Sequence, residues 1–409
     1  MREINFENCI KYIMLVKQLV GDVVGNAWLS KELEKIYSYK PPKKLRKLSF
    51  IDYTERFHPL AFLIYQTDKQ LKTCVEKKFF EVSEQILRLS YLGENLFVLK
   101  NQNTKGLDRK IRDLTLSDKA LFDKTTYEIE IAAAYARKGY SVEFVETKSK
   151  EGEKTPDLLV NKEVEVECKK KDRKTNRDIR NTEYWKLISR KASGMMEHFG
   201  LNYAVFIKTQ RDPEKEDVEF ILRQLQELIK EKKQGRFAFR DRGIGITLQI
   251  LSLKDQEIES EGIEFGTSEE LDYVVPAVEV RKKENGKIFI RNPRIFGFKS
   301  AVLPERITSV IETIKDAKQQ LSGKRPGLIY VNLNMIDRKM IDRDFERLDS
   351  LIKQLLKNNS TISGIVVTTE YFVKDAQGCI YSHKARVIRN EYAKYSLPSK
   401  FEIVGEKGN

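Results

Sequence analysis

Charged side chains alternate along the segment TPDLLVNKEVEVECKKK, which covers residues 155–171. Successive side chains of a β-strand point to opposite faces, so this alternation gives a strand one polar and one apolar face. The polar face of the expected strand carries four charged residues: Glu163, Glu165, Glu167 and Lys169. Valines and a cysteine occupy the other face, and Asp157 opens the preceding apolar run. The spacing predicts a hairpin whose polar side gathers carboxylates and a lysine.

The chemistry that these residue types suit is the hydrolysis of a phosphodiester. If the two short strands pair as a hairpin, Asp157 approaches Glu167 and Lys169 at the same end. Two carboxylates held together repel each other unless a cation bridges them. Mg²⁺, with Mn²⁺ as an alternative, prefers such oxygen ligands and keeps waters and a substrate phosphate in its shell. A neighbouring lysine can orient the water and offset the charge that develops on the phosphate.

The elements that must position these residues are expected between residues 124 and 208. In TTYEIEIAAAYARKGY, apolar residues recur at helical spacing, and Gly139 is a natural end for the helix. Further along, the patterns predict three strands, a helix and a strand: 140–147, 156–160, 163–170, 181–199 and 202–209. The predicted order is therefore helix, strand, strand, strand, helix, strand, which makes the chain a mixed α/β protein.

Pro156-Asp157 followed by Glu167-Cys168-Lys169, within this order of elements, resembles the PD-(D/E)xK, or restriction-endonuclease-like, nuclease superfamily. The resemblance covers about a fifth of the chain. It implies a core with a central mixed sheet flanked by helices. It also implies Asp157 and Glu167 as metal ligands and Lys169 as the catalytic lysine.

Two further positions concern acids near the motif: one on the first helix and Glu165 on the strand. In many members of the superfamily a glutamate early in the first helix supports the metal site, and Tyr127-Glu128 is similar to that pattern. The resemblance thus implies Glu128 as a catalytic residue, whereas helical geometry alone leaves Glu128 and Glu130 open. Glu165 shares the polar strand face, where it could assist a second metal ion or be solvated or paired with a lysine.

The rest of the chain is organised around this core. Residues 1–115 are expected to form a helical N-terminal region, and 116–409 a restriction-endonuclease-like nuclease domain. Within that domain we expect a core at 124–208, an insertion at 211–300 and an α/β extension at 301–409. An alternative stays open, because the helix ERITSVIETIKDAKQQL and the strand GLIYVNL could replace 181–208 as the second helix and last strand.

The charge distribution favours a polyanionic partner. The net charge is +14, with a pI of about 9.3, and ten Lys or Arg against three acids lie between residues 169 and 191. A charge run of this kind is often only a solvated surface. Beside the acidic site, however, five of these residues are expected to contact phosphates: Lys170, Lys171, Arg173, Lys174 and Arg177.

The cysteine pattern and hydropathy suggest the compartment. Four scattered cysteines without a CxxC pair, and only three histidines, disfavour a structural zinc site and fit a reducing cytoplasm. No apolar run is long enough to span a bilayer, and charged residues interrupt the apolar N-terminus, unlike a signal peptide. We therefore expect a cytoplasmic protein that does not bind or span a membrane.

Together these features predict a Mg²⁺-dependent nuclease, with DNA as the preferred substrate and endonucleolytic cleavage as the activity. A role in defence or DNA processing is expected by analogy alone. Two alternatives stay open: a catalytically silent nucleic-acid-binding or assembly protein on the same fold, and an RNA-directed nuclease. A homo-oligomer or a protein partner is compatible with either.

Overall fold

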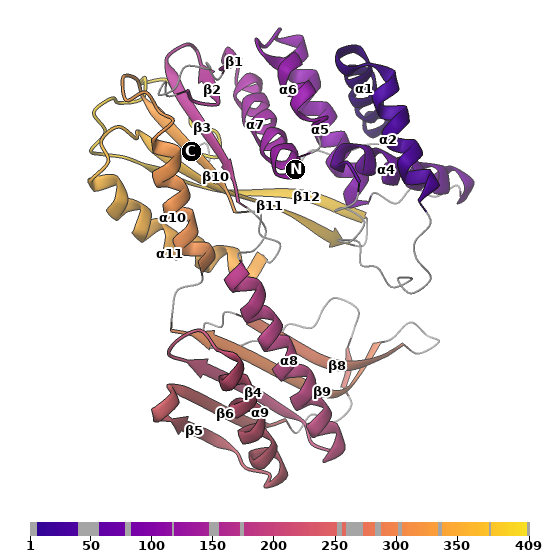
Figure 1. Ribbon diagram of the computed structural model, residues 1–409, viewed down its shortest axis with the longest axis vertical. Coiled ribbons are helices and arrows are strands. Elements are labelled where there is room, and N and C mark those ends of the chain that lie inside the picture. Colours follow the sequence, from indigo (N-terminus) through magenta and orange to yellow (C-terminus); the bar gives the residue numbers. More distant parts are fainter. Residues whose placement is uncertain are drawn as a thin grey trace. The chain divides into compact units, whose positions relative to one another are not determined.

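The computed structural model describes residues 6–39, 57–77, 83–116, 118–146, 155–171, 176–251, 256–258, 273–282, 288–301, 305–333, 338–375 and 378–406. The chain divides into two compact units (Figure 1). The first unit comprises Met1–Arg173 and Val310–Asn409, and the second comprises Lys174–Ser309. The second unit is therefore inserted into the sequence of the first. Both units combine helices with a mixed sheet, so the chain is a mixed α/β protein.

The first unit begins with a group of helices that pack on one another and on the following α/β part. These are α1 (Phe6–Val24), α2 (Asn26–Ser38), α4 (Pro59–Lys77), α5 (Glu84–Asn101) and α6 (Leu107–Asp113). Helices α1 and α5 cross closely at Gly93, where a Cβ atom would lie 2.2 Å from the carbonyl oxygen of Tyr12. Buried side chains from these helices belong to the same apolar core as the sheet of the first unit. The helical region 1–115 is thus not a separate compact unit.

The first unit is built on a six-stranded sheet in the order β1-β2-β3-β10-β11-β12. Its strands are β1 (Val142–Phe144), β2 (Leu158–Val160), β3 (Val164–Lys170), β10 (Gly327–Asn332), β11 (Gly364–Asp375) and β12 (Gly378–Arg389). β1, β2 and β3 pair antiparallel, β3 and β11 both run parallel to β10, and β12 closes the order antiparallel to β11. Three helices complete this part: α7 (Lys119–Arg137), α10 (Glu305–Lys318) and α11 (Arg338–Lys357).

Helix α7 covers one face of this sheet with small side chains. Ile129, Ala132, Ala133 and Ala136 are all buried and belong to the same core as Val166 of β3, as the apolar stripe predicts. Alanines allow the helix axis to approach the sheet closely while they retain a high helix propensity. On α10 apolar residues at helical spacing are likewise buried, namely Ile307, Val310, Ile314 and Ala317, and Leu321 is buried just after the helix ends. The expected helices at these positions are therefore confirmed.

The expected core at 124–208 is wrong in its second half. β3 pairs with β10, with Glu167 opposite Ile329, whereas the strand at 203–209 lies in the sheet of the second unit. All six residues of β10 are buried, as a central parallel strand covered on both faces requires. Strand 203–209 instead carries an exposed lysine at Lys208 and suits a sheet with one open face. The order helix, three strands, helix, strand is thus completed by α10 and β10, which was the alternative assignment.

The second unit holds a sheet in the order β5-β6-β4-β9-β7, with β8 also paired to β9. Its strands are β4 (Tyr203–Thr209), β5 (Gly235–Phe239), β6 (Ile244–Ile250), β7 (Gln256–Ile258), β8 (Tyr273–Lys282) and β9 (Ile288–Ser300). Helices α8 (Asn176–His198) and α9 (Lys215–Lys230) pack on it, and a 3₁₀ turn (Arg240–Arg242) joins β5 to β6. The inserted segment therefore spans 174–309, not the expected 211–300.

Within the part of the chain that the structure describes, no helix is both long and apolar enough to cross a bilayer.

A pair of helical glycines provides a test of the packing. Gly93→Ala should lower the free energy of unfolding by about 1–3 kcal/mol, since its new methyl group overlaps the α1 backbone. Gly194→Ala on α8 is the matched control, because nothing lies within 4 Å of the position where its Cβ would be built. That variant should gain about 0.5–1 kcal/mol from helix propensity. Chemical denaturation of both variants measures this, and equal effects would contradict the close crossing of α1 and α5.

Candidate active site

A tight hairpin turn fixes the register of the two strands that carry the acidic motif. Asn161 and Lys162 have φ angles of 49° and 59°, both in the left-handed region that two-residue hairpin turns favour. β2 and β3 then pair with Leu158 opposite Val166. Asp157 precedes the paired part of β2, so it lies level with Glu167 on β3. A shift of one residue would turn every polar side chain of β3 toward the core.

Direct contacts hold the three motif residues together. The backbone N–H of Asp157 donates to Oε2 of Glu167 at 3.2 Å, and the N–H of Cys168 donates to Oδ2 of Asp157 at 2.8 Å. Nζ of Lys169 lies 2.6 Å from Oε1 of Glu167. The structure thus brings Asp157, Glu167 and Lys169 to one place, as the sequence predicts.

Helix α7 contributes a fourth acid and an additional cation. Glu128 lies on this helix with its side chain 1% exposed, and its carboxylate forms an ion pair with the ammonium of Lys110 on α6. Lys124, one turn earlier on α7, has its ammonium 3.3 Å from Oε1 of Glu128 and 3.2 Å from Oδ1 of Asp157. Lys124 therefore bridges the acid of the helix and the acid of the hairpin.

Burial makes the negative charge of this cluster costly. Burial and, second, the nearby Asp157 carboxylate raise the pKa of Glu167 to about 8, although Lys169 opposes the shift. Burial and Asp157 also raise the pKa of Glu128 above its ordinary value, against the effect of Lys110. For Lys124, burial opposes the charge, but the carboxylates of Asp157 and Glu128 outweigh it and raise the pKa. The carboxyls therefore favour a proton or a cation in their midst.

The donor set can be compared with what a divalent ion requires. Among the described residues, no three Asp, Glu, His or Cys side chains are grouped in a way that could hold a metal ion. Mg²⁺ commonly uses only one or two carboxylates and completes its shell with waters and substrate phosphate. Asp157 and Glu167 supply such a pair, and the ion pairs of Lys124 show that a positive charge is already accommodated beside Asp157. These residues fit an open magnesium site and do not fit a closed site made by protein ligands alone.

The remaining glutamates of the motif region lie elsewhere. Glu165 is buried and accepts hydrogen bonds from the backbone N–H and the hydroxyl of Ser322, at 2.8 and 2.6 Å. Glu165 thereby holds the loop between α10 and β10 against β3. The expectation of a solvated or lysine-paired Glu165 is wrong, and nothing in these contacts supports a second metal ion. Oε1 of Glu130 lies 3.1 Å from Nδ1 of His383 on β12. Of the two helical acids, Glu128 is therefore the one at the candidate site.

The expected phosphate-binding residues that the structure describes have partners within their own units. Lys170 is half-buried and forms an ion pair of 2.5 Å with Glu370, and Lys171 donates to the hydroxyl of Thr313 at 2.9 Å. Arg177 pairs with Asp212 inside the second unit. Arg173 and Lys174 lie outside the described residues. Lys170 and Lys171 thus have structural partners that the charge count could not reveal.

Sequence reasoning missed the two lysines that compensate the acids. Lys124 precedes Glu128 by four residues, a spacing that places both side chains on the same side of a helix. This i,i+4 relation was the available signal for Lys124. Lys110 gave none, because its contact with Glu128 depends on how α6 packs beside α7.

Comparison with known proteins finds no family model that matches the chain and no curated protein with significant similarity to it.

Replacement of Lys124 tests its role as a substitute for a metal cation. Lys124→Met should destabilise the protein by about 1–3 kcal/mol in EDTA, because the partly exposed ammonium no longer offsets two carboxylates. Excess Mg²⁺ should then raise the melting temperature more in this variant than in the wild type. Lys31→Met, at an exposed position of α2, is the control for loss of a charge. An equal Mg²⁺ effect in all three proteins would contradict this role.

The raised pKa of Glu167 predicts a pH dependence of stability. This carboxyl has an ordinary pKa of 4.5 and a pKa of about 8 in the folded chain, so between these values the folded state retains a proton that the unfolded chain has lost. The stabilisation is complete below about pH 4.5 and is lost as the pH rises toward 8, with a slope of up to about 1.4 kcal/mol per pH unit.

Denaturation in EDTA across this pH range measures the slope. Glu167→Gln should flatten it, since an amide does not titrate, and Mg²⁺ should offset it in the wild type by favouring the ionised carboxyl. The same slope in the wild type and the Gln variant would assign the effect to other groups.

Proposed function

We propose that the first unit is a Mg²⁺-dependent nuclease of the PD-(D/E)xK, restriction-endonuclease-like type. The observation that carries the proposal is the convergence of Asp157, Glu167 and Lys169 at the open end of a β-hairpin. The order α7-β1-β2-β3-α10-β10 supports the assignment, because it reproduces the element order expected of that core. DNA is proposed as the substrate, and the cytoplasm as the compartment, on the sequence arguments alone.

Each side chain has a distinct role in this proposal. Asp157 and Glu167 would hold Mg²⁺, or Mn²⁺ in its place, which when bound supplies Lewis-acid polarisation of the scissile phosphate. Lys169 keeps its ammonium beside Glu167, where it can hydrogen-bond an attacking water and stabilise charge on the phosphate oxygens. Glu128 is fixed by Lys110 and holds Lys124 in place, so it organises the charge around Asp157.

A catalytically silent nucleic-acid-binding or assembly protein on the same fold is the second candidate. One observation favours it: Lys124 already neutralises Asp157 and Glu128 without a metal ion. Against it, a binding protein gains nothing from buried carboxylates that face a polyanion, since their repulsion weakens the complex. We therefore favour the nuclease.

Cleavage assays distinguish the two candidates. Supercoiled plasmid, single-stranded DNA and RNA are incubated with the purified protein in Mg²⁺, Mn²⁺ or EDTA. Metal-dependent cleavage of plasmid DNA is expected, and Asp157→Asn and Lys169→Met should each reduce its rate by about a hundredfold or more. Glu163→Gln, an exposed acid in the hairpin turn of the same segment, is the control and should retain activity. Preferential cleavage of RNA would change the substrate but keep the enzyme.

Two outcomes would contradict the nuclease proposal. If the wild type leaves all three substrates intact with either metal, yet binds them, the silent binding protein is the better description. The same conclusion follows if the Asp157 and Lys169 variants cleave as fast as the Glu163 control, because the activity then arises elsewhere.

A further inference from the structure

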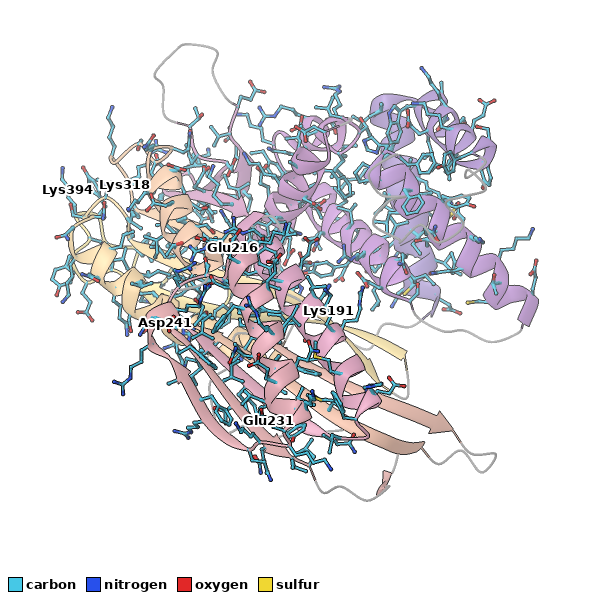
Figure 2. The ribbon with its side chains drawn as sticks, turned by 60° about the horizontal axis from the view of Figure 1, so that its bottom comes forward. Lys191, Glu216, Glu231, Asp241, Lys318 and Lys394 are labelled. Carbon is cyan, nitrogen blue, oxygen red and sulfur yellow. The ribbon has the colours of Figure 1, made fainter. Side chains whose placement is uncertain are left out.

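Helices α8 and α9 pack on one face of the sheet in the second unit, and exposed side chains among the described residues mark the opposite, open face. Tyr203, Val205 and Ile207 of β4 pack in the same core as residues of α8 and α9. The alternate residue Lys208 points to the opposite face, where it is exposed. Figure 2 views the helical side of this unit, with Lys191 on α8 and Glu216 on α9 labelled. The open face is therefore the side of the sheet that helices α8 and α9 leave uncovered.

A row of four residues crosses this open face at one level of the sheet. Ala238 of β5 pairs with Gly245 of β6, Gly245 pairs with Lys208 of β4, and Lys208 pairs with Lys299 of β9. Half of the row therefore has almost no side chain, and the other half carries two long cationic ones. The missing side chains leave a hollow beside the lysines.

The hollow has a volume of about 320 Å³ and extends to the loops at this end of the sheet. Arg240, in the turn after β5, joins Lys208 and Lys299 in its lining. Among the described residues that line the hollow, these three are cationic and none is acidic.

This combination of charge and shape selects one kind of ligand. Two lysines directly opposite each other on neighbouring strands repel, and an anion between them removes that cost. Arginine adds a planar fork that matches the oxygens of a phosphate. The rest of the lining is largely apolar, with Ala238, Gly245 and Ala301 forming a shallow surface. An anion that carries a flat, less polar group fits this surface better than a bare anion does.

We propose that this hollow is a nucleotide-binding site, with Lys208, Lys299 and Arg240 holding the phosphate and the base or sugar lying over Ala238 and Gly245. The nucleotide is either free or one unit of a nucleic-acid strand, since the recognised chemistry is the same. The site is separate from Asp157 and Glu167 and does not require that the first unit cuts nucleic acid.

Two variants remove the site by different means. Lys208→Ala combined with Lys299→Ala removes the charge. Gly245→Leu fills the hollow, and its backbone permits this, because the nearest atom to a Cβ there is the Cβ of Lys208 at 4.0 Å. The control replaces Lys191 and Lys230 by alanine, which removes the same charge from exposed positions on α8 and α9. Circular dichroism and thermal unfolding check that each variant is folded.

Binding is measured with the full-length protein in EDTA, so that cleavage does not interfere. The probes are a fluorescein-labelled single-stranded DNA 12-mer, the same sequence as RNA, AMP, dAMP and inorganic phosphate. Both site variants should weaken binding of the strands or of the free nucleotides by about tenfold or more, the factor that corresponds to one charged hydrogen bond. For the DNA strand, the double lysine variant should also lower the slope of log K against log salt by up to about 0.7, the value for one phosphate contact on a single strand.

The outcomes separate the two sources of nucleotide. Loss of strand binding, with free nucleotides not bound by the wild type, supports a strand as the ligand. Loss of AMP or dAMP binding supports a free nucleotide. If both site variants bind all five probes as the Lys191 and Lys230 control does, or only phosphate responds, the nucleotide site is refuted. Neither result depends on cleavage, so this proposal and the nuclease proposal can fail independently.

Discussion

Electrostatic repulsion among buried carboxylates is the constraint on which the first unit depends. Glu128 and Glu167 are almost completely buried, and each feels the charge of Asp157. Three lysines offset this repulsion, and they come from three different elements: α6, α7 and β3. The helices and the hairpin are thus tied together by the same charges that define the candidate site. A protein selected only for stability would have replaced such a cluster by apolar residues.

The sheet of the first unit requires a contact between distant parts of the sequence. β3 ends at Lys170 and its neighbour β10 begins at Gly327, with the whole second unit between them. Such a long excursion costs little more entropy than a short loop, provided that the inserted segment folds on its own core. The second unit has that core, built from α8, α9 and the strands that they cover. The insertion is therefore compatible with a continuous sheet.

Local pattern was sufficient for the motif and insufficient for the partners of its residues. Alternation along 163–169 correctly predicted that Val164, Val166 and Cys168 join the apolar core, and the stripe of α7 its buried face, because both depend on neighbours in the sequence. It did not predict that Glu165 and Glu167 on the other face are also buried. Local pattern could not predict that β10, and not 203–209, is the strand beside β3. Both runs are apolar, and only the packing decides which one is covered on two faces. Likewise the partners of Lys170 and Glu165 lie 200 and 157 residues away.

The connectivity of the second unit has a mechanical consequence. An inserted unit is attached by two chain segments, so it cannot swivel as freely as a domain at the end of a single linker. Its first residue, Lys174, follows Lys169 by only five positions, and its last, Ser309, lies on the same helix as Thr313, which binds Lys171. Both chain segments that join the two units therefore begin close to the strand end that carries Lys169, one along the chain and the other through the hydrogen bond between Lys171 and Thr313.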